Sequence, residues 1–114
     1  MVTPPLIYKI LPEALWQQAR EDGVFRGAPV DLADGYIHFS TAEQVAETAA
    51  RHFGGQGGLV LLAVDPSSLT ELKWETSRGG ALFPHLYADM EASKVVWAKP
   101  LPWRQGRHIF PALA

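Results

Sequence analysis

The chain has 114 residues, of which 47% are hydrophobic and 19% are charged. This composition excludes a disordered chain, and the length predicts one domain over residues 1–114 rather than a two-domain enzyme. A net charge of −2 excludes a cationic coat for membranes or general nucleic-acid binding, and the absence of cysteine excludes disulfides and thiolate metal sites. No export or membrane signal is visible, so we expect a cytoplasmic protein.

Apolar periodicity predicts the first elements of the chain. Residues 6–10 are β-branched and aromatic and predict a strand. A helix is expected with Pro12 as its first residue and an apolar face over residues 13–22, and Gly23 is placed to end it with a left-handed cap. Residues 24–34 show no clear period and are expected to form a loop.

The segment 36–40 alternates in polarity and predicts a second strand. If Ile37 and Phe39 face the core, then Tyr36, His38 and Ser40 share the other face. A capping-box pattern on Ser40 or Thr41 predicts a helix that starts directly after the strand and stops at Gly54.

The second half of the chain reads mainly as strands. Residues 59–64 form a continuous aliphatic run and predict a central strand that is buried on both faces. Residues 72–76 alternate, residues 82–87 indicate an edge strand or loop interrupted by Pro84, and residues 94–98 predict a late strand. The glycines at 54–58 follow a helix and precede a strand, so they predict a turn rather than a phosphate loop.

Two clusters carry candidate chemistry. In the first, the His38 imidazole can act as an acid, a base or a hydrogen-bond donor at neutral pH, beside a helix start that offers free backbone N–H groups. Ser40 and Thr41 are candidate ligand contacts there. The alternatives are that His38 bonds a local carbonyl and that Ser40 and Thr41 only cap the helix.

The second cluster runs from Glu75 to Tyr87. Arg78 can clamp a phosphate or carboxylate, Gly79 allows close backbone approach, and His85 and Tyr87 project to one side of an extended segment. Glu75 could orient a histidine, pair with Arg78 or face solvent. The alternative is a surface turn with a solvated arginine and a core tyrosine.

We predict that the two clusters converge around one small-molecule or nucleotide ligand. His38, Glu75 and His85 are then the catalytic candidates, and alanine at either histidine should remove function at little cost in melting temperature. The scattered histidines predict no metal site.

Several motifs together resemble one family. They are Asp-Gly-Tyr-Ile-His-Phe-Ser-Thr at 34–41, Arg-Gly-Gly at 78–80 and Phe-Pro-His-Leu-Tyr at 83–87. Over residues 6–99 the chain resembles the DUF952 family, small bacterial proteins of unknown function with a distant resemblance to ADP-ribosyltransferases. The resemblance implies an α+β fold with a small split, largely antiparallel β-sheet and two main helices.

The resemblance also implies a cleft between the sheet halves that takes NAD as a substrate rather than as a cofactor. Lys9 occupies the first-strand position where that superfamily has His or Arg, and residues 38–41 resemble its second-strand segment, but neither Glu75 nor His85 matches its late glutamate. Three hypotheses follow: an NAD-using transferase or glycohydrolase, an acid–base hydrolase or cyclising enzyme on a small phosphorylated metabolite, and a binding module without turnover. The oligomeric state is not predicted.

Overall fold

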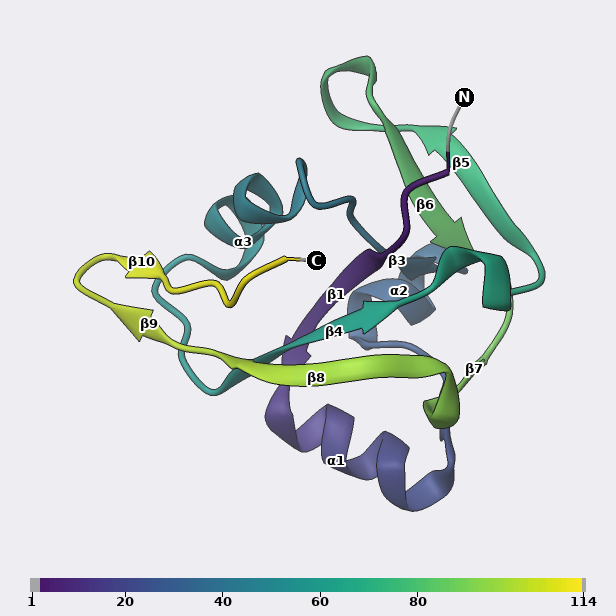
Figure 1. Cartoon of the computed structure of the whole chain (residues 1–114), viewed down its shortest axis with the longest axis horizontal. Coiled ribbons are helices and arrows are strands. Elements are labelled where there is room, and N and C mark those ends of the chain that lie inside the picture. Colours follow the sequence, from purple (N-terminus) through teal and green to yellow (C-terminus); the bar gives the residue numbers. More distant parts are fainter. Residues whose placement is uncertain (1–2, 114) are drawn as a thin grey trace.

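The computed structural model describes residues 3–113, except for the side chain of Arg78. Within that range the chain folds into antiparallel strands and three α-helices (Figure 1). The helices are α1 (Glu13–Asp22), α2 (Pro29–Asp34) and α3 (Val45–Phe53), with 3₁₀ turns at Pro66–Ser68, Arg78–Gly80 and Ala92–Lys94. The strands are β1 (Ile7–Pro12), β2 (Val24–Phe25), β3 (Ile37–His38), β4 (Leu59–Val64), β5 (Leu72–Thr76), β6 (Leu82–Leu86), β7 (Met90–Glu91), β8 (Val95–Leu101), β9 (Trp103–Arg104) and β10 (Arg107–His108).

One three-stranded sheet forms the centre of the molecule, in the order β1-β4-β8. Strand β4 is buried along its whole length, as its aliphatic sequence predicts. Because side chains alternate along a strand, Leu62 and Val64 face one apolar cluster while Leu61 and Ala63 face another. The central sheet is therefore covered on both faces.

A second three-stranded sheet has the order β3-β6-β5. It meets the central sheet where Tyr8 and Ser40 exchange backbone hydrogen bonds, with Tyr8 N–H donating to the Ser40 carbonyl at 2.7 Å and Ser40 N–H to the Tyr8 carbonyl at 2.9 Å. The short pairs β2–β7 and β9–β10 complete the strand pairing. This arrangement confirms the expected α+β class with mostly antiparallel sheets; α1 and α3 are the two expected main helices, and the short α2 is additional.

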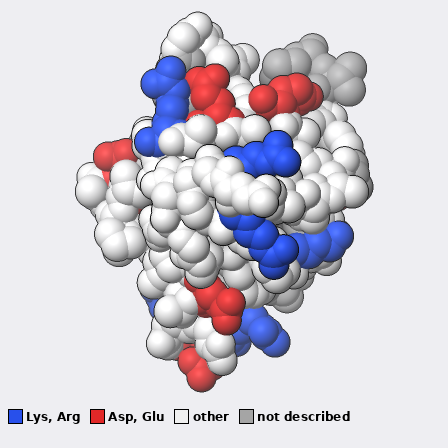
Figure 2. Space-filling model, turned by 90° about the vertical axis from the view of Figure 1, so that its left-hand side faces the viewer, with Lys and Arg blue, Asp and Glu red and all other residues white. Residues whose placement is uncertain are grey.

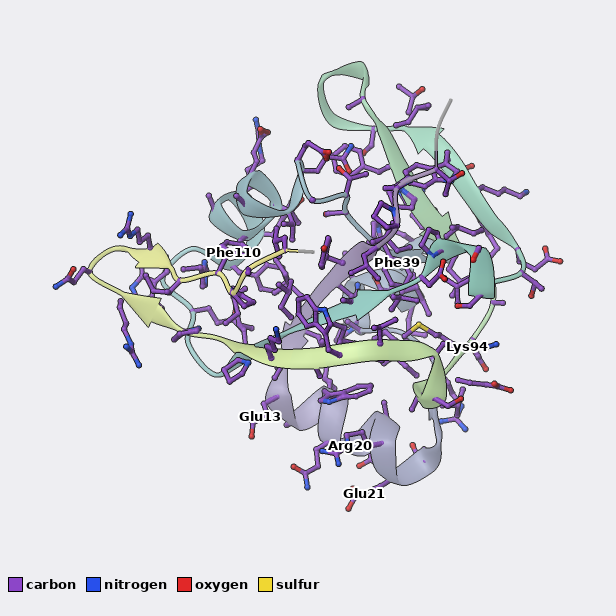
Figure 3. The ribbon with its side chains drawn as sticks, viewed as in Figure 1. Glu13, Arg20, Glu21, Phe39, Lys94 and Phe110 are labelled. Atoms are coloured by element: carbon purple, nitrogen blue, oxygen red, sulfur yellow. The ribbon has the colours of Figure 1, made fainter. Side chains whose placement is uncertain are left out.

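The two longer helices cover opposite faces of the central sheet. Helix α1 buries Ala19 against one cluster and ends at Gly23 in the left-handed conformation, with φ 79°, as predicted. Helix α3 buries Val45 and Ala49 against the other. Figure 3 shows Phe39 in the interior, whereas Glu13, Arg20 and Glu21 point outward from α1.

Three local expectations are wrong. Residues 24–34 contain β2 and α2 rather than a loop, because Pro29 starts a helical turn that Gly35 ends in the left-handed region. Helix α3 begins at Val45, after a turn, and no side chain caps it. Strand β6 lies in the middle of its sheet, because the Pro84 carbonyl still accepts a bond from Phe39 N–H although proline has no N–H to donate.

Charges of both signs are interspersed on the face shown in Figure 2, in keeping with the small net charge. Among the described residues, no helix has the length and apolar character that crossing a membrane requires.

Candidate active site

Strand register places His38 and His85 side by side. The two residues are direct partners in the antiparallel β3–β6 pair, where Cβ atoms are about 4.5–5.5 Å apart. Their ring centroids are 5.5 Å apart, with the rings edge to face. The predicted proximity of the two histidines, one from each motif cluster, is confirmed.

The neighbouring strand β5 supplies a carboxylate to His85. Lys73 lies opposite His85, so Glu75 lies diagonally across from it on the same face. The Nδ1 atom of His85 is 2.7 Å from Glu75 Oε1, and the Tyr87 hydroxyl donates to the same oxygen at 2.7 Å. These bonds from Tyr87 and then His85 lower the pKa of Glu75, and the Glu75 carboxylate raises the pKa of Tyr87 to about 12. Glu75 therefore stays ionised and fixes the orientation of the His85 ring.

Asp31, in helix α2, is the carboxylate that orients the His38 ring. It is 1% exposed, and its Oδ1 atom is 2.7 Å from His38 Nδ1. Lys9, 5% exposed, contacts both carboxylate oxygens at 2.9 Å, and Ala28 N–H donates to Oδ2 at 2.8 Å. Gly27 has φ +127°, and a Cβ there would be 3.0 Å from the Asp31 Cβ, so only glycine lets the chain close over this carboxylate.

The pKa values of both members of the buried ion pair, Lys9 and Asp31, are shifted. Burial opposes ionisation of Asp31, but the bonds from His38, Lys9 and Ala28 together with the Lys9 charge outweigh it and lower the pKa of Asp31 to about 2. Burial lowers the pKa of the Lys9 ammonium, and the Asp31 carboxylate opposes that shift. The Asp31 carboxylate therefore stabilises the protonated form of Lys9 against the effect of burial.

Acid should weaken the fold between about pH 4 and pH 2. The pKa of Asp31 is about 2 when folded, below the value of about 3.9 for an unfolded Asp. A carboxyl with a lowered pKa contributes its stability above the unfolded pKa and loses it as pH falls through the folded one, here about 2 kcal/mol. Urea unfolding at pH 6, 4, 3 and 2 should show this loss in the wild type and not in Asp31→Asn. Equal acid sensitivity of the two chains would contradict it.

His38 also has a carboxylate on its second nitrogen. Its Nε2 atom is 3.0 Å from Asp34 Oδ2, and the Asp34 side chain is 46% exposed. A neutral imidazole has one N–H and can donate to only one of these two carboxylates, whereas a protonated ring can donate to both. Because Asp34 is exposed, it is the contact that a ligand can replace.

Tyr36 packs over the histidine pair. Its ring centroid is 4.6 Å from that of His38, 4.1 Å from His85 and 5.2 Å from Tyr87. Its position follows from the alternation predicted for 36–40, because it shares the His38 face. The four rings form one continuous aromatic wall.

This wall borders a cavity of about 530 Å³, within the usual range of small-molecule sites of about 300–1,000 Å³. The cavity lies at the junction of the two sheets and α3. Its lining comprises Tyr8, Lys9, Ile10, Val30, Asp34, Tyr36, His38, Phe39, Ser40, Thr48, His52, Phe53, Ser77, Phe83 and His85. Among the described residues, no group of three His, Cys, Asp or Glu side chains is arranged to hold a metal ion.

The family model described as "Protein of unknown function (DUF952)" matches residues 10–98. The chain belongs to the DUF952 family. The DUF952 domain thus spans most of the protein and contains both histidines and both carboxylates that hold them.

Two solved structures of protein CC0527 from Caulobacter crescentus have the same fold as this DUF952 chain. The crystal structure is 52% identical, with 91% of this chain and 93% of that one covered and a TM-score of 0.88. The solution NMR structure is 51% identical, with 91% and 90% covered and a TM-score of 0.82. The chain has no match among curated proteins.

The DUF952 fold gathers some of the predicted site residues and separates others. His38, Glu75, His85 and Tyr87 form one cluster, and Ser40 lines the cavity with its hydroxyl 2.9 Å from that of Thr48. Thr41 is outside the cavity lining, and its N–H donates to the Gln44 side chain. Gly79 occupies an exposed turn with φ 64°, and the Arg78 side chain lies outside the described residues.

The expectation that alanine at either histidine costs little melting temperature needs correction for His85. The His38 side chain is 32% exposed, but His85 is only 5% exposed and packs beneath Tyr36. His85→Ala would leave a cavity beneath Tyr36 and would remove the hydrogen bond to Glu75, so it would lower the stability of the fold. Glutamine is the better substitution because it keeps volume and polarity.

Sequence reasoning missed Asp31, Asp34, Tyr36 and Tyr8 as site residues. For Asp31 a signal existed, because proline at the first helical position followed two residues later by an acid is typical of a helix N-terminus. His52, which was not among the candidate site residues, lines the cavity; His108 bonds the Gln56 carbonyl through Nε2 at 3.0 Å.

Proposed function

We propose that this protein is an acid–base enzyme that hydrolyses or cyclises a small phosphorylated metabolite. The observation that carries the proposal is the pair of adjacent imidazoles, each with Nδ1 on its own carboxylate. Proton transfer from and to a phosphate ester needs one group that accepts and another that donates, both within hydrogen-bond reach of the same centre.

His85 is the base. Its Nδ1–H donates to ionised Glu75, which leaves the lone pair on Nε2, and among the described residues no group bonds that atom. A lone pair held this way accepts the proton of an attacking water or substrate hydroxyl. Glu75 is then a positioning residue, and Tyr87 keeps it ionised and in place.

His38 is the acid. Asp31 retains the Nδ1–H, and a ligand oxygen takes the place of Asp34 at Nε2. Two imidazoles 5.5 Å apart can contact different oxygens of one tetrahedral phosphate. The imidazolium also offsets the charge that develops on those oxygens.

The reaction balances with these two groups alone. The attacking oxygen forms a bond to phosphorus as its proton moves to His85 Nε2. The bond from phosphorus to the leaving oxygen breaks, and that oxygen takes the proton of His38 Nε2. Water as the attacking group gives hydrolysis, and a hydroxyl of the substrate gives a cyclic ester.

A substrate panel tests this function directly. Bis(p-nitrophenyl) phosphate, p-nitrophenyl phosphate and the nucleoside 2′,3′-cyclic phosphates should include at least one ester that the protein turns over with a bell-shaped pH profile. Asp34→Asn should raise the affinity for that ester, because it removes a competing carboxylate from His38. No turnover across the panel, or a weaker affinity in Asp34→Asn, would contradict the proposal.

The second candidate is the NAD-using transferase or glycohydrolase. The observation that favours it is the pair of partly exposed carboxylates at the site, Asp34 and Glu75, which would stabilise a positively charged ribosyl group. It predicts nicotinamide release from NAD and a lower kcat/KM in Asp34→Asn, whereas tighter binding of a phosphate ester predicts a higher kcat/KM in that variant. The same variant therefore separates the two functions.

A further inference from the structure

The cavity beyond the histidines has the wrong charge for a phosphate. Among its described lining residues, Lys9 is the only lysine or arginine, and both oxygens of Asp31 hold its ammonium. Most of the remaining wall is aromatic or aliphatic, from Tyr36, Phe39, Phe53, Phe83, Ile10 and Val30. An anion placed there would lose its hydration without gaining a counter-charge.

One described residue of the cavity lining has a buried polar atom without a partner. Tyr8 lines the cavity and is 1% exposed, and its hydroxyl is the one buried side-chain polar atom without a hydrogen bond among the described residues. An unsatisfied buried hydroxyl costs free energy, so such a group in a native fold needs an explanation. The Tyr8 ring itself is fixed, 5.9 Å from that of Trp97.

We propose that the cavity binds an uncharged heteroaromatic ring of the substrate and that the Tyr8 hydroxyl donates to an acceptor on the edge of that ring. The inference rests on the proposed function, in which the histidines contact the phosphate ester. The rest of the same substrate molecule then occupies the cavity. The substrate class is thus a phosphate ester that carries a nucleobase-like ring.

The chemistry of the wall selects for such a ring. Aromatic side chains contact a flat ring by stacked or edge-to-face packing, which a sugar or an aliphatic chain does not reproduce. Burial, with a smaller contribution from Glu43, raises the pKa of Tyr8, so its hydroxyl stays protonated and acts as a donor. The ring must therefore present a nitrogen lone pair or a carbonyl oxygen.

Binding of uncharged nucleosides tests the inference without any turnover. Adenosine, guanosine, uridine and cytidine are titrated against the whole protein by calorimetry and by amide chemical shifts, with ribose as the ligand that lacks a ring. We expect at least one nucleoside to bind and to shift amides of β1 and α3, and ribose not to bind. Absence of binding by all four nucleosides would overturn the inference.

Tyr8→Phe removes only the hydroxyl. We expect it to weaken nucleoside binding roughly threefold to tenfold, as for one lost hydrogen bond, and to leave the melting temperature unchanged or higher. As a control, Ser68→Ala removes a hydroxyl that lies outside the cavity lining and donates to the Asp65 carbonyl, so it should leave nucleoside affinity unchanged. Unchanged affinity in Tyr8→Phe with a lower melting temperature would assign the hydroxyl a structural bond and overturn the proposal.

Val30→Trp provides an independent check of the location. Val30 is 56% exposed and lines the cavity, so a tryptophan there should fill the entrance without disturbing the core and should abolish nucleoside binding. Binding that survives this change would place the ring elsewhere. His85→Gln separates the two proposals. Nucleoside binding should persist in this variant even if turnover is lost, so the ring site and the catalytic pair can fail independently.

Discussion

Asp31→Asn should destabilise the protein by about 3–5 kcal/mol, because removal of one partner from a buried ion pair leaves the other charge without compensation. Lys9 is 5% exposed, and Asp31 holds its ammonium at 2.9 Å through both oxygens. The same change weakens the anchor of His38 Nδ1. Urea unfolding followed by tryptophan fluorescence at neutral pH measures the loss.

Two further variants isolate the ion pair as the cause. Asp34→Asn changes an acid in the same helix that is 46% exposed, so it should cost less than about 0.5 kcal/mol. Lys9→Met combined with Asp31→Asn removes both charges and should recover at least about 1 kcal/mol relative to Asp31→Asn alone. A cost below about 1 kcal/mol for Asp31→Asn would show that Lys9 finds another partner or reaches water.

The sequence predicted those parts of the fold in which local pattern and tertiary packing agree. The aliphatic run of β4 and the Gly23 end of α1 were predicted correctly, because burial on both faces and a left-handed helix cap leave local signatures. Pro12, expected as the first residue of the helix, is instead the last residue of β1 and precedes α1. The order of strands in the sheets leaves no such signature. Pro84 favoured an edge strand because proline has no N–H to donate. Strand β6 nevertheless lies in the middle of its sheet, because its partner β3 is only two residues long and pairs with it at only two positions.

The two histidines of the candidate site were predicted from the sequence, whereas Asp31, the carboxylate that bonds His38, was not. His38 and His85 stood out because each occurs in a polar motif on an extended segment, and orienting a histidine was one of three roles left open for Glu75. Asp31 was missed because residues 24–34 have no apolar period, so α2 was read as a loop. Its importance depends on Lys9, 22 positions away in the chain, and only the tertiary structure brings the two together.

His85→Gln should lower kcat/KM for a phosphate ester that the wild type turns over by about 10²–10⁴, the usual contribution of a general acid or base. Glutamine can keep a hydrogen bond to Glu75, but it has no lone-pair nitrogen to accept a proton. The melting temperature should fall by no more than a few degrees, because glutamine fills most of the space beneath Tyr36. Steady-state kinetics from pH 5 to 9, together with thermal unfolding, measure both effects.

The pH profiles then assign the two roles separately. His85→Gln should lose the limb of the bell that reports the base, and His38→Gln should lose the limb that reports the acid. Glu75→Gln should keep a hydrogen bond to Nδ1 while favouring the wrong imidazole tautomer, so kcat should fall by about tenfold or more with KM nearly unchanged. That split marks a positioning residue, since a merely structural loss would alter the melting temperature and leave the shape of the pH profile intact. If both histidine variants retain the full bell-shaped profile, proton transfer does not involve this pair and the acid–base mechanism is wrong.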